Sequence, residues 1–159
     1  MLISNPYLRG YLFSALLEGP TLLRLLVKDM TDEQADARTD PERFTLREAI
    51  AHLADWETVF RERFERVVSE DSPVLPNIDE GQRAIDRDYG RTDWREQLAL
   101  FESRRAENLE FLKGLKIESW ARTGNRPEIG NMSLYDLVQL MPLHDSYHQK
   151  QAREYLSLG

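Results

Sequence analysis

Residues 45–69 read TLREAIAHLADWETVFRERFERVVS, and this stretch decides the fold class. It begins with a capping box, in which the Thr45 hydroxyl and the Glu48 carboxylate each accept a hydrogen bond from the other's backbone amide. Apolar side chains then recur at helical spacing: Leu46, Ala49, Ile50, Leu53, Trp56, Phe60, Phe64 and Val67. The pattern predicts a long amphipathic helix whose apolar stripe must be covered by other elements.

Three further segments show helical periodicity, over residues 7–28, 93–115 and 133–156. The first contains Gly19-Pro20, which we expect to kink or break it, because proline cannot donate a backbone hydrogen bond. The last opens on Ser133-Leu-Tyr-Asp136, which resembles a second capping box.

The segments between these helices are rich in turn residues, and none shows the alternation of a β-strand. Residues 70–93 form the longest connection, in which residues 80–88 could hold a short helix. We therefore predict an all-α fold, an antiparallel four-helix bundle with a long connection between its second and third helices. Residues 1–159 are expected to form a single domain.

The composition excludes several classes of function. A formal net charge of −7 offers no basic surface for nucleic acid. The chain has no cysteine, so a thiol required for chemistry would have to come from a small molecule. The N-terminal residues lack the features of a signal peptide, and no stretch is predicted to span a membrane. We expect a cytoplasmic protein without nucleic-acid or membrane partners, with a homodimer left open.

The three histidines of the chain fall on two predicted helices. His144 and His148 are four residues apart, so both lie on one face of the last helix, in the middle of its apolar stripe. His52 lies at the border of the apolar stripe of the second helix. Two inward imidazoles and a third from a facing helix can bind one metal ion and leave a coordination position open.

The alternative from pattern alone is that these histidines are hydrogen-bonded core residues without a metal. A histidine pair at this spacing is common, and Asp145 stands where zinc proteases of the H-E-x-x-H type have glutamate. A serine triad and a nucleotide-binding loop are not supported by any motif in the chain.

Three stretches together resemble the DinB-like superfamily, which includes YfiT-like metal-binding four-helix bundles. They are the segment from Phe44 to Glu57 with His52, the segment from Arg122 to Gly130 followed by Met132-Ser-Leu, and His144-Asp-Ser-Tyr-His-Gln-Lys-Gln151. The resemblance covers essentially the whole chain. One departure is Pro142, which precedes His144 within the last helix and could shift its position.

The resemblance implies that His52, His144 and His148 bind one divalent transition metal, with zinc or nickel favoured and iron or manganese as alternatives. It also implies a metal-activated water or small-molecule thiol, and hence an enzyme of the hydrolase or thiol S-transferase type. The competing hypothesis is a non-catalytic metal-dependent binding or stress-response protein. The catalytic residues are not predicted, but helical spacing places Trp56 and Gln151 near the histidines, and we expect both to line a substrate cleft.

Overall fold

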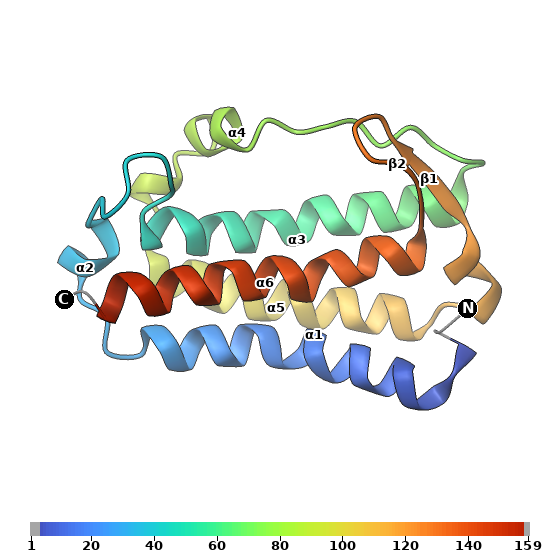
Figure 1. The fold of residues 1–159 in the computed structure, drawn as a ribbon, viewed down its shortest axis with the longest axis horizontal. Helices are drawn as coiled ribbons and strands as arrows, with labels where there is room; N and C mark the ends of the chain where they lie inside the picture. Colours follow the sequence, from blue (N-terminus) through green and yellow to red (C-terminus); the bar gives the residue numbers. More distant parts are fainter. Residues whose placement is uncertain (1–3, 158–159) are drawn as a thin grey trace.

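The computed structural model describes residues 4–157 and confirms the four-helix bundle (Figure 1). Its long helices are α1 (Pro6–Val27), α3 (Leu46–Ser69), α5 (Trp94–Lys113) and α6 (Leu134–Ser157). The predicted capping box is present at the start of α3, where Thr45 and Glu48 bond each other's amides. The bounds of all four helices lie close to those expected from apolar periodicity.

The order of the helices around the bundle differs from a simple up-and-down arrangement. α1 and α3 each pack against α5 and α6. Figure 1 shows that α3 and α5 run in the same direction, opposite to α1 and α6. The starts of α3 and α5 are joined directly, since Arg47 Nη1 donates to the Thr92 carbonyl over 2.8 Å. The long connection is needed because the chain must return along the whole bundle before α5 begins.

Shorter elements occupy the connections. They are α2 (Asp32–Asp36), α4 (Glu80–Asp86), the 3₁₀ helices η2 (Tyr89–Arg91) and η3 (Ile117–Ala121), and the strands β1 (Thr123–Arg126) and β2 (Gly130–Ser133). The short helix expected in the long connection is therefore confirmed as α4, followed by η2.

The expectation that the chain contains no strand is wrong, because β1 and β2 form an antiparallel hairpin. Each strand has only four residues, and most of them are polar, so no apolar alternation marks them. Gly130 has a φ of +103°, which glycine adopts readily. A Cβ atom at Gly124 would lie 2.9 Å from side-chain atoms of Leu75 and Val67, so glycine allows the hairpin to pack closely on α3.

Of the kink or break expected at Gly19-Pro20, the break is wrong, because helix α1 is continuous through both residues. Pro20 has no amide hydrogen for the Leu16 carbonyl, but Arg105 Nη1 of α5 donates to that carbonyl over 2.8 Å. By length and composition alone, α1 is the one described helix apolar enough to cross a membrane. In the structure it packs against α5 and α6 as a member of the bundle.

Candidate metal centre

The three histidines converge between α3 and α6. One ligand atom from each of His52, His144 and His148 lies within 4.8 Å of the others. His52 is fully buried and His148 is 5% exposed, whereas His144 is partly exposed. The predicted grouping of these residues is therefore present in the fold. Helix α6 is continuous through Pro142, which does not prevent His144 from reaching His52.

The spacing of the rings fits a common ion. The Nε2 atoms of His52 and His144 are 2.9 Å apart. Two imidazole nitrogens that bind one metal at about 2.0–2.1 Å lie roughly 3 Å apart. Without a metal the same separation is a hydrogen bond in which one Nε2 carries the proton. Such a bond involves only two of the three rings, whereas a metal would use one nitrogen of each.

The second nitrogen of His148 is fixed by Gln151. His148 Nδ1 lies 3.0 Å from Gln151 Oε1, and Gln151 Nε2 donates to the Phe44 carbonyl over 2.7 Å. Because the amide oxygen can only accept, Nδ1 must carry the proton and Nε2 keeps a free lone pair. A histidine that binds a metal is commonly oriented in this way by a second hydrogen bond.

Burial keeps all three imidazoles neutral. It lowers the pKa of His52 to about 3, with a smaller contribution from the repulsion between His52 and His148 when both are protonated. Burial also lowers the pKa of His148 to about 4, against the opposing effect of its bond to Gln151. The pKa of His144 is well below its ordinary value, again mainly through burial. Neutral rings offer lone pairs to a cation at pH 7, so the donor set fits a divalent transition metal.

His52 has one atom that the protein leaves unsatisfied. Its Nδ1 is buried and has no hydrogen-bond partner among residues 4–157. The rings of Phe44 and Trp56 lie 5.2 Å and 4.8 Å from the His52 ring, so its surroundings are apolar. His52 is therefore held by packing, whereas His148 is held by hydrogen bonding.

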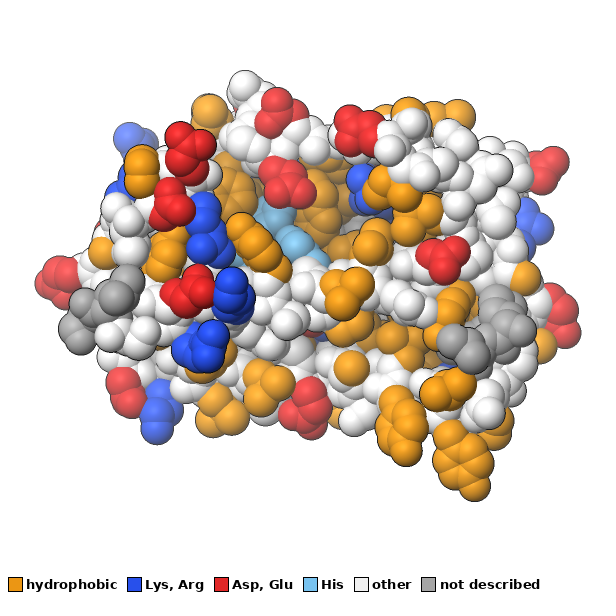
Figure 2. Space-filling view, in the orientation of Figure 1, with side chains coloured by type: hydrophobic (Ala, Val, Ile, Leu, Met, Phe, Trp, Pro, Cys, Tyr) orange, Lys and Arg blue, Asp and Glu red, His pale blue; other side chains and the backbone are white. Residues whose placement is uncertain are grey.

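A cleft of about 830 Å³ opens above His144 and His148. Figure 2 shows histidine side chains, in pale blue, at the floor of a hollow on this face. The cleft is lined by the loop before α3, by α4 and η2, and by α6: Arg38, Pro41, Glu42, Arg43, Phe44, Glu48, Glu80, Gly81, Ala84, Ile85, Asp88, Gly90, His144, Tyr147, His148 and Gln151. Its volume suits a small molecule.

The predicted roles of Trp56 and Gln151 have different outcomes. Gln151 lines the cleft as expected. Trp56 does not, because it is 7% exposed and packs in the hydrophobic core beneath His52. Its ring packs against the His52 imidazole, 4.8 Å between the ring centroids, so Trp56 is a packing residue and the expectation that it lines the cleft is wrong.

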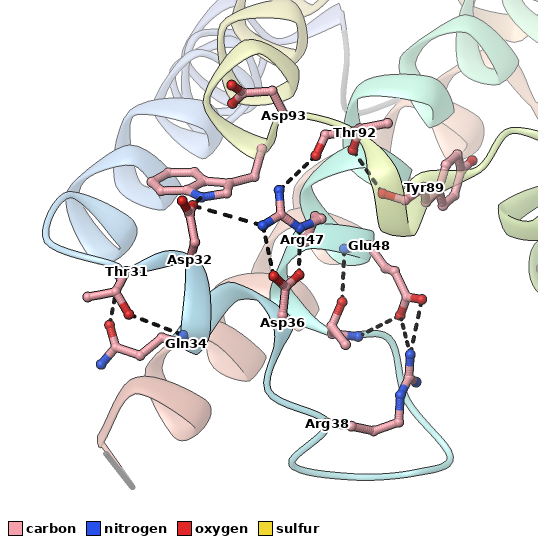
Figure 3. A network of polar contacts seen from close by, with 12 residues as sticks. Thr31, Asp32, Gln34, Asp36, Arg38, Arg47, Glu48, Tyr89, Thr92 and Asp93 are labelled. Atoms are coloured by element: carbon pink, nitrogen blue, oxygen red, sulfur yellow. Dashed lines mark hydrogen bonds and ion pairs between the residues drawn. The ribbon is translucent and has the colours of Figure 1, made fainter.

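Polar networks hold the walls of the cleft. Asp55, one turn after His52, accepts hydrogen bonds from Tyr89 Oη over 2.6 Å and from Arg83 Nη2 over 3.0 Å, which ties α4 and η2 to α3. Figure 3 shows a second network, in which Arg38 pairs with Glu48 and Arg47 pairs with Asp36. These bonds fix the wall formed by α4 and η2, and the wall formed by the loop before α3, relative to His52.

A buried ionic cluster lies behind the histidines and was not predicted from the sequence. Arg105 of α5 binds Glu57 of α3 and Asp145 of α6, with Nη2 2.7 Å from Glu57 Oε1 and Nη1 2.7 Å from Asp145 Oδ2. Burial alone would lower the pKa of Arg105, but the two carboxylates outweigh it and raise the pKa above its ordinary value. Because Asp145 follows His144 directly, the cluster fixes the part of α6 that carries the histidines.

Comparison with known proteins agrees with this architecture. The sequence profile of the DinB superfamily matches residues 15–152. The chain belongs to the DinB superfamily. A relative in Oceanobacillus iheyensis named "Putative metal-dependent hydrolase OB0782" is 29% identical over 129 residues, which cover 81% of this chain and 74% of the relative.

The fold of this DinB-superfamily chain also matches a solved structure. YfiT from Bacillus subtilis superposes with a TM-score of 0.87 at 24% identity, over 95% of this chain and 87% of that one. YfiT is described as "a probable metal-dependent hydrolase with an unusual four-helix bundle topology". The parallel course of α3 and α5 is the feature by which this chain departs from an up-and-down bundle.

Proposed function

We propose that this protein is a metal-dependent enzyme that binds one divalent transition metal through His52, His144 and His148. The observation that carries the proposal is the convergence of three neutral imidazoles, two of which, His144 and His148, line the floor of an open cleft. A structural metal site is normally closed by a fourth protein ligand, whereas a catalytic site keeps a position for water or substrate. No fourth histidine or carboxylate joins the cluster within residues 4–157.

The chemistry is of the hydrolase or thiol S-transferase type. A bound divalent ion lowers the pKa of a water or thiol that it binds and so provides a nucleophile at neutral pH. The residues of this chain orient that centre: Gln151 directs Nε2 of His148 inward, and Trp56 packs behind His52. The relative from Oceanobacillus iheyensis bears a hydrolase name, which supports the hydrolase form.

The absence of cysteine from the chain is consistent with an external low-molecular-weight thiol in the transferase form. Imidazole ligands suit zinc, nickel, copper and iron, so the ligand set alone does not select the metal. We retain zinc or nickel as the first expectation and iron or manganese as alternatives. The substrate is a small molecule that fits the cleft of about 830 Å³.

The test uses protein purified without a histidine tag, because a tag would itself collect nickel. Elemental analysis should find about one divalent metal per chain, natively or after reconstitution with zinc, nickel, iron or manganese. Cobalt-loaded protein is then titrated with small thiols while the absorption of the metal is recorded. A change in the cobalt spectrum supports the transferase form, and turnover of ester or amide substrates without thiol supports the hydrolase form.

Two outcomes would contradict the proposal. Protein that takes up no metal under any of these conditions would show that the histidines form a metal-free core cluster. A bound metal that never exchanges its non-protein ligand, for any thiol or anion, would instead support the non-catalytic binding protein.

A further inference from the structure

Arg63 of α3 is a buried arginine that forms no ion pair within residues 4–157. It is only 5% exposed, and its one side-chain hydrogen bond to the described residues runs from Nη2 to the Pro76 carbonyl over 3.3 Å. No carboxylate of residues 4–157 lies within ion-pair distance of its guanidinium. Arg105, the other fully buried arginine, has two carboxylate partners. A buried charge without a partner is strongly unfavourable, so the contrast calls for an explanation.

A second arginine lies beside it. Arg126 of β1 donates from Nη2 to Asn77 Oδ1 over 3.2 Å, and its Nε is buried without a partner. Burial, and next the positive charge of Arg126, lower the pKa of Arg63 to about 10, so Arg63 remains cationic at pH 7. Glu62 and Glu80 are the acidic neighbours of Arg63, but neither forms an ion pair with it. Two guanidinium groups, each with N–H donors that no described residue accepts, therefore lie close together.

Arg63 lies one turn of α3 beyond a residue that neighbours the histidines. Arg63 follows Phe60 by three residues on α3, and the Phe60 ring is 6.2 Å from the His144 ring. Glu80 connects the two regions, because it lines the cleft above His144 and is also a charge neighbour of both arginines. Figure 2 shows basic side chains in the same hollow as the histidines, farther along its floor.

We propose that Arg63 and Arg126 form an anion subsite that binds a carboxylate or phosphate group of the substrate. Guanidinium groups are suited to this task, since their planar donors match two oxygens of an oxyanion. The anion would supply the ion-pair partner that Arg63 lacks among the described residues and the acceptor that Arg126 Nε lacks there. The placement of the substrate's reactive end at the histidines rests on the proposed metal-dependent function, whereas anion binding itself does not.

The experiment measures anion binding to metal-free and metal-loaded protein by calorimetric titration with inorganic phosphate and with succinate. The arginine Nε–H resonances are followed by NMR in the same titrations. We expect either anion to shift the resonances of Arg63 and Arg126 in both forms of the protein. The anion that binds more tightly identifies the group as phosphate or carboxylate.

Substitutions give the quantitative test. Arg63→Met should weaken binding of the preferred anion about tenfold or more, the loss expected from a charge-assisted hydrogen-bonding group. It should also raise the Tm in buffer without oxyanions, because the unpaired buried charge is removed. Arg153→Met is the matched control, since Arg153 is an exposed arginine of α6, and it should change neither quantity.

Either of two results would overturn the inference. One is that the Arg63 and Arg126 resonances do not change at saturating anion, and the other is that Arg63→Met binds the anion with the affinity of the wild type. Arg126→Gln provides a second variant in case Arg63→Met does not fold. His148→Ala should keep anion binding, so a failed metal site and a failed anion subsite are distinguished.

Discussion

The carboxylate of Asp145 in α6 occupies the space that a side chain at Gly19 of α1 would fill. A Cβ atom at Gly19 would overlap with Asp145 Oδ2 and would lie 3.1 Å from Arg105 Nη1. The following residue, Pro20, leaves the Leu16 carbonyl free for Arg105. The Gly19-Pro20 pair therefore makes room for the buried ionic cluster and also provides it with an acceptor.

Gly19→Ala is expected to destabilise the protein. The added methyl group must displace the Asp145 carboxylate from Arg105, and overpacking of a buried site typically costs about 1–3 kcal/mol, before any loss from the ion pair. The measurement is the free energy of unfolding in urea. Gly10→Ala is the matched control, because Gly10 lies in the same helix and a Cβ there meets nothing within 4 Å. It should stabilise by up to about 1 kcal/mol through helix propensity. Equal effects at the two positions would contradict the packing argument.

The helices and the histidine cluster could be predicted because each depends on local periodicity. His144 and His148 lie in the apolar stripe of α6. The capping box fixes where α3 begins, and so which face of that helix carries His52. The parallel course of α3 and α5 could not be predicted in the same way, because it depends on packing between distant helices. The β1–β2 hairpin was missed because its strands are short and polar.

The residues of the ionic cluster could have been identified from the helical periodicity of the sequence. Glu57, Arg105 and Asp145 each occupy a position of the apolar stripe of their helix, where Phe60, Phe101 and Met141 are neighbours one turn away. Charged residues in such positions predict partners of opposite charge on facing helices. The buried state of Arg63, in contrast, depends on the connection that covers α3, which no local pattern reveals.

Gln151→Ala is expected to weaken metal binding without removing it. The substitution deletes the acceptor that fixes the His148 tautomer, and loss of such a partner typically costs about 10–100-fold in metal affinity. Competition with a coloured chelator measures the affinity. Gln82→Ala is the control, since Gln82 is exposed and its side chain donates to Asp86 within the same helix, α4. Wild-type affinity in Gln151→Ala would show that this hydrogen bond does not orient a ligand.

His148→Ala should abolish tight metal binding, and His52→Ala should weaken it strongly. Each removes one of three ligands, and two imidazoles chelate less well than three. Circular dichroism should show that the helices persist in both variants, because the hydrophobic core does not depend on the ion. Metal content by elemental analysis is the readout. Either variant with a full equivalent of tightly bound metal would exclude that residue from the ligand set.

The stability of the metal-free protein is expected to fall as the pH is lowered from 7 to 5. Burial lowers the folded-state pKa of His148 to about 4, whereas the ordinary value of a histidine is 6.5. Between these values the unfolded chain binds a proton that the folded protein does not, so the folded state loses stability on acidification. For His148 alone the loss between pH 7 and pH 5 is about 2 kcal/mol.

Urea unfolding of EDTA-treated protein at both pH values measures this loss of stability, and His148→Ala, which lacks this group, should lose correspondingly less. An identical pH dependence in the variant and the wild type would show that His148 is not held neutral by the fold. Because His52 has its pKa lowered to about 3, the variant should still lose stability over the same range, in the same direction.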